Sequence, residues 1–198
     1  MKLYNTPTSP FGRKVLITAI EKGLDGKMEV LPARTPEAEL YKKNPLDKLP
    51  VLVTDDGEVL IESSLICEYL DEVGTGPKLL PSDAKGRRRI IQAQAVSQGV
   101  LDAVVLLRME DRRKPEERSK EWIERQQKKV DRGVPALEAL LGTLPASLTL
   151  AHITFACTLW FMDKHGIGGD WRKTAPKLGA WYDGFTKRPS FTKTEPAA

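Results

Sequence analysis

The stretch that decides the fold is Pro50-Val51-Leu52-Val53-Thr54-Asp55-Asp56-Gly57-Glu58-Val59-Leu60-Ile61. Its two apolar runs flank Asp55-Asp56-Gly57, and an Asp-Gly pair tolerates the positive φ angles of a tight turn. The stretch therefore predicts a β-hairpin. A helix is expected to follow from about Ser63, because apolar residues then recur on one helical face: Leu65, Ile66, Tyr69, Leu70 and Val73.

The residues upstream of the hairpin predict a strand–helix–strand unit. Lys2–Asn5 and Met28–Leu31 are the two strand candidates. Between them, Ser9 and Pro10 suit the N-cap and the first position of a helix, and Gly23 is a plausible stop. The first part of the chain therefore has the order β-α-β followed by β-β-α.

Downstream of a linker at 74–81 the strand signals stop. Pro135 lies inside the second of the helical ranges that follow and should kink or break it. A mixed α/β run followed by a helical run indicates two domains, which we place at 1–76 and 83–198. The expected helices of the second domain cover residues 83–112, 116–141, 149–164 and 175–187.

Composition and charge narrow the class of protein. The chain has 198 residues, of which 40% are hydrophobic and 29% charged, as in ordinary soluble globular proteins. Residues Met1–Pro7 lack the apolar run of a secretory signal, and no stretch reaches the roughly 18 apolar residues that span a bilayer. We therefore expect a cytoplasmic protein without a membrane partner. The net charge of +4 is modest and the basic runs lack interleaved aromatics, so no nucleic-acid partner is expected.

The cysteines and histidines do not form a metal-binding pattern. Cys67 and Cys157 each lie in an apolar, helix-like stretch, there is no Cys-x-x-Cys motif, and only two histidines are present. We expect no metal ion, and two buried thiols that behave as small hydrophobes.

Four segments stand in order along almost the whole chain. They are Thr8–Val15, Asn44–Leu52, Glu62-Ser63 with Ile66 and Tyr69-Leu70, and Pro176–Leu178 with Trp181-Tyr182 and Arg188–Phe191. Together they resemble the cytosolic glutathione transferase superfamily. This resemblance implies a thioredoxin-like, glutathione-binding domain over 1–76, an all-α domain over 83–198 with a second-substrate pocket, and usually a homodimer. Glutathione would be the co-substrate and a small hydrophobic electrophile the second substrate.

Ser9 is the candidate catalytic residue. Conjugation needs the thiolate of glutathione, and a thiol of pKa ~8.5 is only a few per cent ionised at pH 7. A hydroxyl donor at a helix N-terminus, where the macrodipole favours negative charge, stabilises that anion. A plain N-cap is the alternative role for Ser9; the two are compatible, since a capping serine can still donate its proton outward.

The resemblance assigns glutathione contacts to the loop before the third strand. The backbone of Leu49 would pair with the cysteinyl unit of glutathione, and the bond to Pro50 is expected to be cis. Lys48 would attract the glycyl carboxylate, with a solvated surface lysine as the equally weighted alternative.

The resemblance assigns the γ-glutamyl group to Glu62 and Ser63. The Glu62 carboxylate would bind the ammonium of the ligand, and Ser63 with the helix N-terminus would bind its carboxylate. A simple capped helix start is the alternative. Phe11 and Arg34 are expected to line the same site.

The second-substrate pocket is expected between the Ser9 loop and the first long helix of the second domain. The alternative for the helical residues is ordinary core or dimer interface. The candidates are Phe11, Arg13, Leu101, Val105 and Arg108.

Two residues depart from the family pattern. His152 stands where the family usually has the aspartate of a capping box, and brings no carboxylate to the first backbone N–H. We therefore expect His152→Asp to raise the melting temperature. Gly12, beside Ser9, replaces the larger side chain of many relatives, which predicts a wider pocket or a looser turn.

Three functions fit these residues. The first is conjugation of glutathione to small electrophiles, which the retained set Ser9, Lys48–Pro50 and Glu62-Ser63 favours. The second is a non-catalytic interaction or regulatory module on the same fold. The third is a glutathione-dependent peroxidase or lyase that uses the same thiolate, which sequence does not separate from conjugation.

Overall fold

The structure is a computed structural model that describes residues 1–33, 35 and 38–196. It divides into two compact units, Met1–Leu80 with Arg188–Ala198 and Pro81–Lys187. The C-terminal segment from Arg188, which the sequence placed with the helical domain, thus belongs to the first unit. Charged side chains of its first helix hold it there, as shown below.

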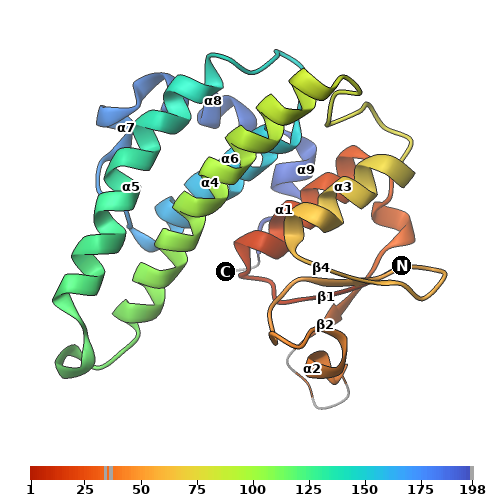
Figure 1. Cartoon of the computed structure of the whole chain (residues 1–198), viewed down its shortest axis with the longest axis horizontal. Coiled ribbons are helices and arrows are strands. Elements are labelled where there is room, and N and C mark those ends of the chain that lie inside the picture. Colours follow the sequence, from red (N-terminus) through yellow and green to blue (C-terminus); the bar gives the residue numbers. More distant parts are fainter. Residues whose placement is uncertain (34, 36–37, 197–198) are drawn as a thin grey trace. The chain divides into compact units, whose positions relative to one another are not determined.

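The first unit is built on a four-stranded sheet with the strand order β2-β1-β3-β4 (Figure 1). β1 pairs in parallel with β2 and antiparallel with β3, and β3 pairs antiparallel with β4. The predicted hairpin is confirmed, because the Thr54 N–H donates to the Glu58 carbonyl at 2.9 Å and Gly57 has φ of 90°. The strands are β1 (Lys2–Asn5), β2 (Glu29–Pro32), β3 (Val51–Val53) and β4 (Val59–Ile61).

Two helices cover one face of this sheet. α1 (Pro10–Glu21) and α3 (Ser63–Val73) lie side by side, and the short α2 (Leu40–Lys43), which the sequence did not predict, lies on the other side (Figure 1). The unit also contains the one-turn helices η1 (Asp25–Lys27) and α9 (Pro189–Thr192). Strands and helices share a fully buried core that includes Leu3, Val15, Ile17, Leu52, Ile66 and Leu70.

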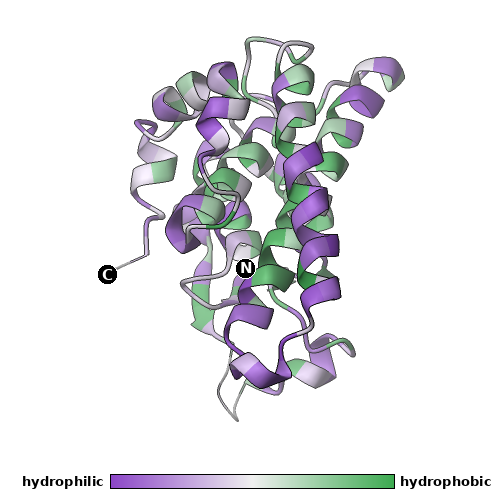
Figure 2. Cartoon of the chain, turned by 90° about the vertical axis from the view of Figure 1, so that its left-hand side faces the viewer, coloured by the Kyte–Doolittle hydropathy of each residue, from purple (hydrophilic) through white to green (hydrophobic). Residues whose placement is uncertain are grey.

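The second unit is all helical, as predicted. α6 is its central helix, and every residue from Leu150 to Met162 is buried. Figure 2 shows hydrophilic (purple) and hydrophobic (green) bands following one another along the helices of the chain. The helices are α4 (Ala84–Asp111), η3 (Pro115–Glu117), α5 (Lys120–Leu141), α6 (Leu150–His165), α7 (Trp171–Thr174) and α8 (Pro176–Phe185).

Pro135 does not break α5, which continues through it to Leu141. Proline removes the N–H that would bond to the carbonyl of Asp131, four residues earlier. Both residues are exposed, so water can satisfy that carbonyl. Meanwhile Val130, Val134 and Leu137 keep the opposite side of the helix buried.

α4 is the one described helix with the length and apolar content of a membrane span. Half of its apolar window is buried within the protein. Core helices pass the same test, and the helix carries polar residues such as Gln94 and Ser97 that are also buried.

His152 closes a capping box at the start of α6, contrary to the expectation that it leaves the box open. Its backbone N–H donates to Thr149 Oγ1 at 3.4 Å, and the Thr149 N–H donates back to His152 Nδ1 at 3.2 Å. The imidazole nitrogen thus takes the place of the family's carboxylate. The ring is 6% exposed, and its centroid lies 5.6 Å from that of Trp181.

We therefore expect His152→Asp to lower the melting temperature rather than raise it. The carboxylate would accept the same bond, but it would also bury a charge and remove the ring from Trp181. His152→Ala should cost about 1–2 kcal/mol through loss of the cap and of packing. Thermal denaturation followed by circular dichroism measures both variants. A higher melting temperature for His152→Asp would contradict this account.

Candidate functional site

Three of the segments that the sequence singled out leave the sheet at the same end. In the strand register Tyr4 pairs with Val51, and Val51 pairs with Ile61. The Ser9 loop follows β1, Leu49 precedes β3, and Glu62 follows β4. Because neighbouring strands lie about 4.8 Å apart, these segments start within roughly 10 Å of one another.

Ser9 is the N-cap of α1. Its backbone is extended, with φ of −74° and ψ of 119°, and its Oγ accepts the Gly12 N–H at 3.2 Å. The Ser9 N–H donates to the Thr6 carbonyl at 3.1 Å, which fixes the turn before the helix. Among the described residues the hydroxyl proton has no acceptor, so it can be donated to an anion beside the helix N-terminus.

Gly12 does not leave a wider pocket, because the side chain of Asn5 fills the space. A Cβ on Gly12 would lie 1.8 Å from Asn5 Oδ1 and 2.4 Å from Asn5 Nδ2. Asn5 is 4% exposed, and its Oδ1 has no hydrogen-bond partner among the described residues. Sequence reasoning missed the role of Asn5. The only signal for it was the glycine at position 12, which leaves room for a neighbouring side chain.

The loop before β3 has the predicted form. The Leu49–Pro50 bond is cis, and neither the N–H nor the C=O of Leu49 has a backbone partner among the described residues. The loop is held by Asn44, whose Nδ2 donates to the Lys48 carbonyl at 2.8 Å and whose Oδ1 accepts the Leu46 N–H at 3.0 Å. Leu49 therefore offers a free backbone edge to an extended ligand.

The remaining glutathione-site candidates differ in accessibility. Lys48 has an exposed side chain, and Phe11 is half-buried on the first turn of α1. Arg34 lies outside the described residues. Asn44 was quoted in the sequence motif without a role, and the Asn44-Pro45 dipeptide was the signal for the turn that it organises.

Glu62 and Ser63 begin α3. Glu62 Oε2 accepts the Ser64 N–H at 2.8 Å, and the Ser63 hydroxyl donates to Glu62 Oε1 at 3.3 Å. Glu62 has φ of 72°, a conformation that costs a non-glycine residue about 1–3 kcal/mol and is found mainly at functional sites. The carboxylate is exposed while Ser63 is buried.

Arg13 does not line a pocket rim, because its side chain is 1% exposed. Its Nη2 donates to the Phe191 carbonyl at 2.8 Å and to Glu195 Oε2 at 2.6 Å. The guanidinium also lies 3.9 Å from the centroid of the Phe191 ring. The second-substrate assignment of Arg13 is therefore wrong, and the residue attaches the C-terminal segment to α1.

A second charge pair fastens the same segment. Arg188 Nε and Nη2 each donate to the Glu21 carboxylate at 3.0 Å, and the Ser190 hydroxyl also donates to it. Burial alone would raise the pKa of Glu21, but the hydrogen bonds from Arg188 and Ser190 lower it below its ordinary value. Glu21 thus stays ionised and keeps this segment in the first unit.

The three helical candidates for the second substrate differ. Leu101 is fully buried, so it is a core residue, as the alternative in the sequence analysis expected. Val105 and Arg108 are partly exposed. Arg108 Nη1 donates to Asp111 Oδ2 at 2.8 Å, and burial together with the charges of Arg108 and Lys164 lowers the pKa of His165.

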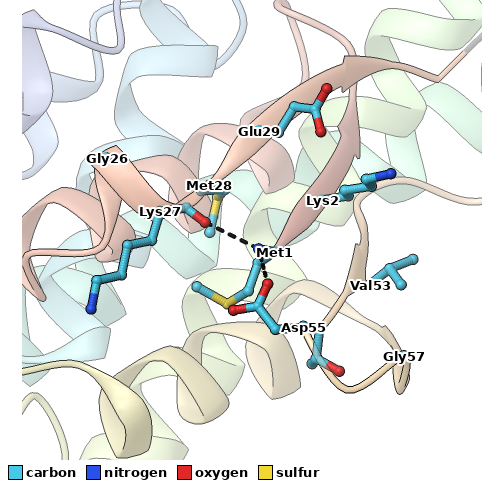
Figure 3. A pocket seen from close by; sticks show the side chains of 10 residues that line it. Met1, Lys2, Gly26, Lys27, Met28, Glu29, Val53, Asp55 and Gly57 are labelled. Carbon is cyan, nitrogen blue, oxygen red and sulfur yellow. Dashed lines mark hydrogen bonds and ion pairs between the residues drawn. The ribbon is translucent and has the colours of Figure 1, made fainter.

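A cavity of about 610 Å³ lies at the opposite end of the sheet from Ser9 (Figure 3). It is lined by the starts of β1 and β2, the end of β3 and the hairpin turn. Within it the N-terminal ammonium donates to the Lys27 carbonyl and pairs with Asp55. The residues that line the cavity include none of the candidate catalytic, glutathione-binding or second-substrate residues.

The cysteines behave as expected. Cys67 and Cys157 are both buried free thiols. Burial raises the pKa of the Cys67 thiol, although the Lys14 charge and the Thr18 hydrogen bond act in the other direction. Among the residues that the structure describes, no group of three His, Cys, Asp or Glu side chains could hold a metal ion.

The contact between Gly12 and Asn5 gives a direct test of this site. Gly12→Ala should destabilise the protein by about 1–3 kcal/mol, because the new methyl group displaces a buried amide. Asn5→Ala in the same chain should recover most of that loss. Gly26→Ala, where a Cβ meets nothing within 4 Å, is the control. Denaturant unfolding measures the wild type, both single variants, the double variant and the control. A double variant as unstable as the sum of the single variants would exclude this packing.

Known proteins match both halves of the chain. Residues 8–73 match the glutathione S-transferase N-terminal domain, and residues 120–184 match the glutathione S-transferase C-terminal domain. The uncharacterised GST-like protein YibF of Escherichia coli is 33% identical over 200 residues, which covers 99% of this chain and 98% of YibF.

Solved structures agree with these matches. A glutathione transferase family member from Pseudomonas fluorescens, solved with bound glutathione, is 34% identical with a TM-score of 0.92, covering 100% of this chain and 99% of that one. The same protein was solved with S-(propanoic acid)-glutathione, at a TM-score of 0.90, 34% identity and full coverage of both chains. With its four-stranded sheet unit and its helical unit, this chain belongs to the glutathione S-transferase family.

Proposed function

We propose that the protein binds glutathione and conjugates it to small hydrophobic electrophiles. The observation that carries this proposal is the strand register, which brings the Ser9, Leu49 and Glu62 segments to one end of the sheet. A relative that is 34% identical to this chain, with the alignment covering nearly all of both chains, was solved with bound glutathione. The same relative was solved with a glutathione whose sulfur carries a propanoic acid, the kind of thioether that conjugation produces.

Each segment has a part in the proposed chemistry. The free backbone edge of Leu49 would hold the cysteinyl unit in an extended form, with Phe11 beside it and Lys48 toward the glycyl carboxylate. The Glu62 carboxylate would bind the γ-glutamyl ammonium, and Ser63 with the α3 N-terminus its carboxylate. These contacts would bring the thiol near the N-terminus of α1.

Ser9 would stabilise the thiolate by donating its hydroxyl proton to the sulfur. Lowering the thiol pKa by ~2 units requires about 2.7 kcal/mol of preference for the anion, which a hydroxyl donor and a helix dipole together can supply. The thiolate then attacks the electrophilic carbon. A carbon–sulfur bond forms, and the leaving group departs with its bonding electrons. Val105 and Arg108 are the candidates for contacts with the electrophile.

Steady-state kinetics with glutathione and an activated chloroarene test this function. Ser9→Ala should lower kcat/KM by up to about 25-fold at pH 7, because a thiol whose pKa rises from ~6.5 to ~8.5 falls from roughly three-quarters to about 3% ionised. Glutathione affinity should change little. Thr8→Ala removes the neighbouring exposed hydroxyl and should behave as wild type.

Other outcomes point to the alternatives. Glutathione binding without turnover of any electrophile would favour the non-catalytic module. Reduction of a hydroperoxide in place of conjugation would favour the peroxidase. Absence of glutathione binding by the wild type would refute the proposal.

The proposal also includes a homodimer that works in the cytoplasm. Sedimentation of the purified protein tests the dimer.

A further inference from the structure

Lys14 places a buried positive charge at the start of α3. Its side chain is 1% exposed, and its Nζ donates to Ser64 Oγ at 3.1 Å. Ser64 in turn donates its backbone N–H to Glu62 Oε2 at 2.8 Å. The ammonium group is therefore connected, through one residue, to the pair proposed to bind the γ-glutamyl group.

A charge in this position acts on the same region as the helix dipole. The N-terminus of α3 carries partial positive charge, to which the ammonium adds a full unit. Salt screens a buried charge much less than an exposed one, so its field persists at high ionic strength. The field reaches into α3, because the Lys14 charge opposes the rise in the pKa of Cys67.

A second buried lysine, Lys22, lies at the C-cap of α1 and has a different role. Lys22 pairs with the Asp71 carboxylate at 3.0 Å, and its Nζ donates to the carbonyls of Gly76 and Pro77. That lysine ties the end of α3 and the following linker to α1. Lys14 lies nearer the N-terminus of α1, at the sheet end from which the Ser9, Leu49 and Glu62 segments leave. Its hydrogen bond goes to Ser64, the residue whose N–H donates to Glu62.

We propose that Lys14 is a positioning residue for the γ-glutamyl carboxylate of glutathione. Its buried charge favours an anion at the α3 N-terminus, and its hydrogen bond holds Ser64 and, through it, the carboxylate of Glu62. This inference rests on the proposed function, since it assigns a residue to the glutathione site.

Two ligands and a small set of variants test it by calorimetry. The ligands are glutathione and γ-aminobutyryl-cysteinylglycine, which lacks only the γ-glutamyl carboxylate. Lys14→Met should weaken glutathione binding by about tenfold or more and change binding of the analogue by less than about threefold. Lys14→Arg should keep most of the preference for glutathione. Lys2→Met removes an exposed lysine at the other end of the sheet and is the matched control.

The outcomes separate this inference from the function on which it rests. Equal weakening of both ligands in Lys14→Met would show a purely structural role and overturn the inference while leaving glutathione binding intact. Binding of neither ligand by the wild type would refute the proposed function itself. If Lys14→Met does not fold, the salt dependence of the wild type provides the test. The preference of the wild type for glutathione over the analogue should persist in ~1 M salt. Loss of that preference in ~1 M salt would assign it to exposed charges and overturn the inference.

Discussion

Burial of three cations along α1 and its C-cap is the constraint on which the first unit depends. Arg13 and Lys14 of α1 and Lys22 at its C-cap are each at most 1% exposed. A buried charge is expensive unless it is compensated, and removing one partner of such a pair typically costs about 3–5 kcal/mol. Arg13 holds the C-terminal segment, Lys14 contacts the first turn of α3, and Lys22 pairs with Asp71 near its end. These contacts fix α1 along its length.

The site follows from that placement. α1 and α3 both begin at the sheet end where β3 also begins, so two helix N-termini and the free edge of Leu49 lie close together. Helix N-termini favour anions. One of them carries the Ser9 hydroxyl, suited to a thiolate, and the other carries Glu62-Ser63, suited to an amino acid head group. The cavity at the other sheet end has none of these features.

Local patterns predicted much of this, and long-range contacts explain the rest. The Asp-Gly hairpin, the Ser9 cap and the cis bond before Pro50 follow from a few neighbouring residues or a family motif, and the structure has all three. Arg13 was misassigned because its partners lie more than 170 residues away. His152 was misjudged because sequence spacing does not reveal that an imidazole nitrogen can replace a carboxylate in a capping box.

The central claim is that this sheet end lowers the thiol pKa of bound glutathione. The most direct measurement is the ultraviolet absorbance of the thiolate, followed against pH with wild-type protein in excess over glutathione. The account predicts that bound glutathione ionises about 2 pH units below the free thiol, whose pKa is ~8.5. Bound glutathione that titrates at the same pH as free glutathione would contradict the account.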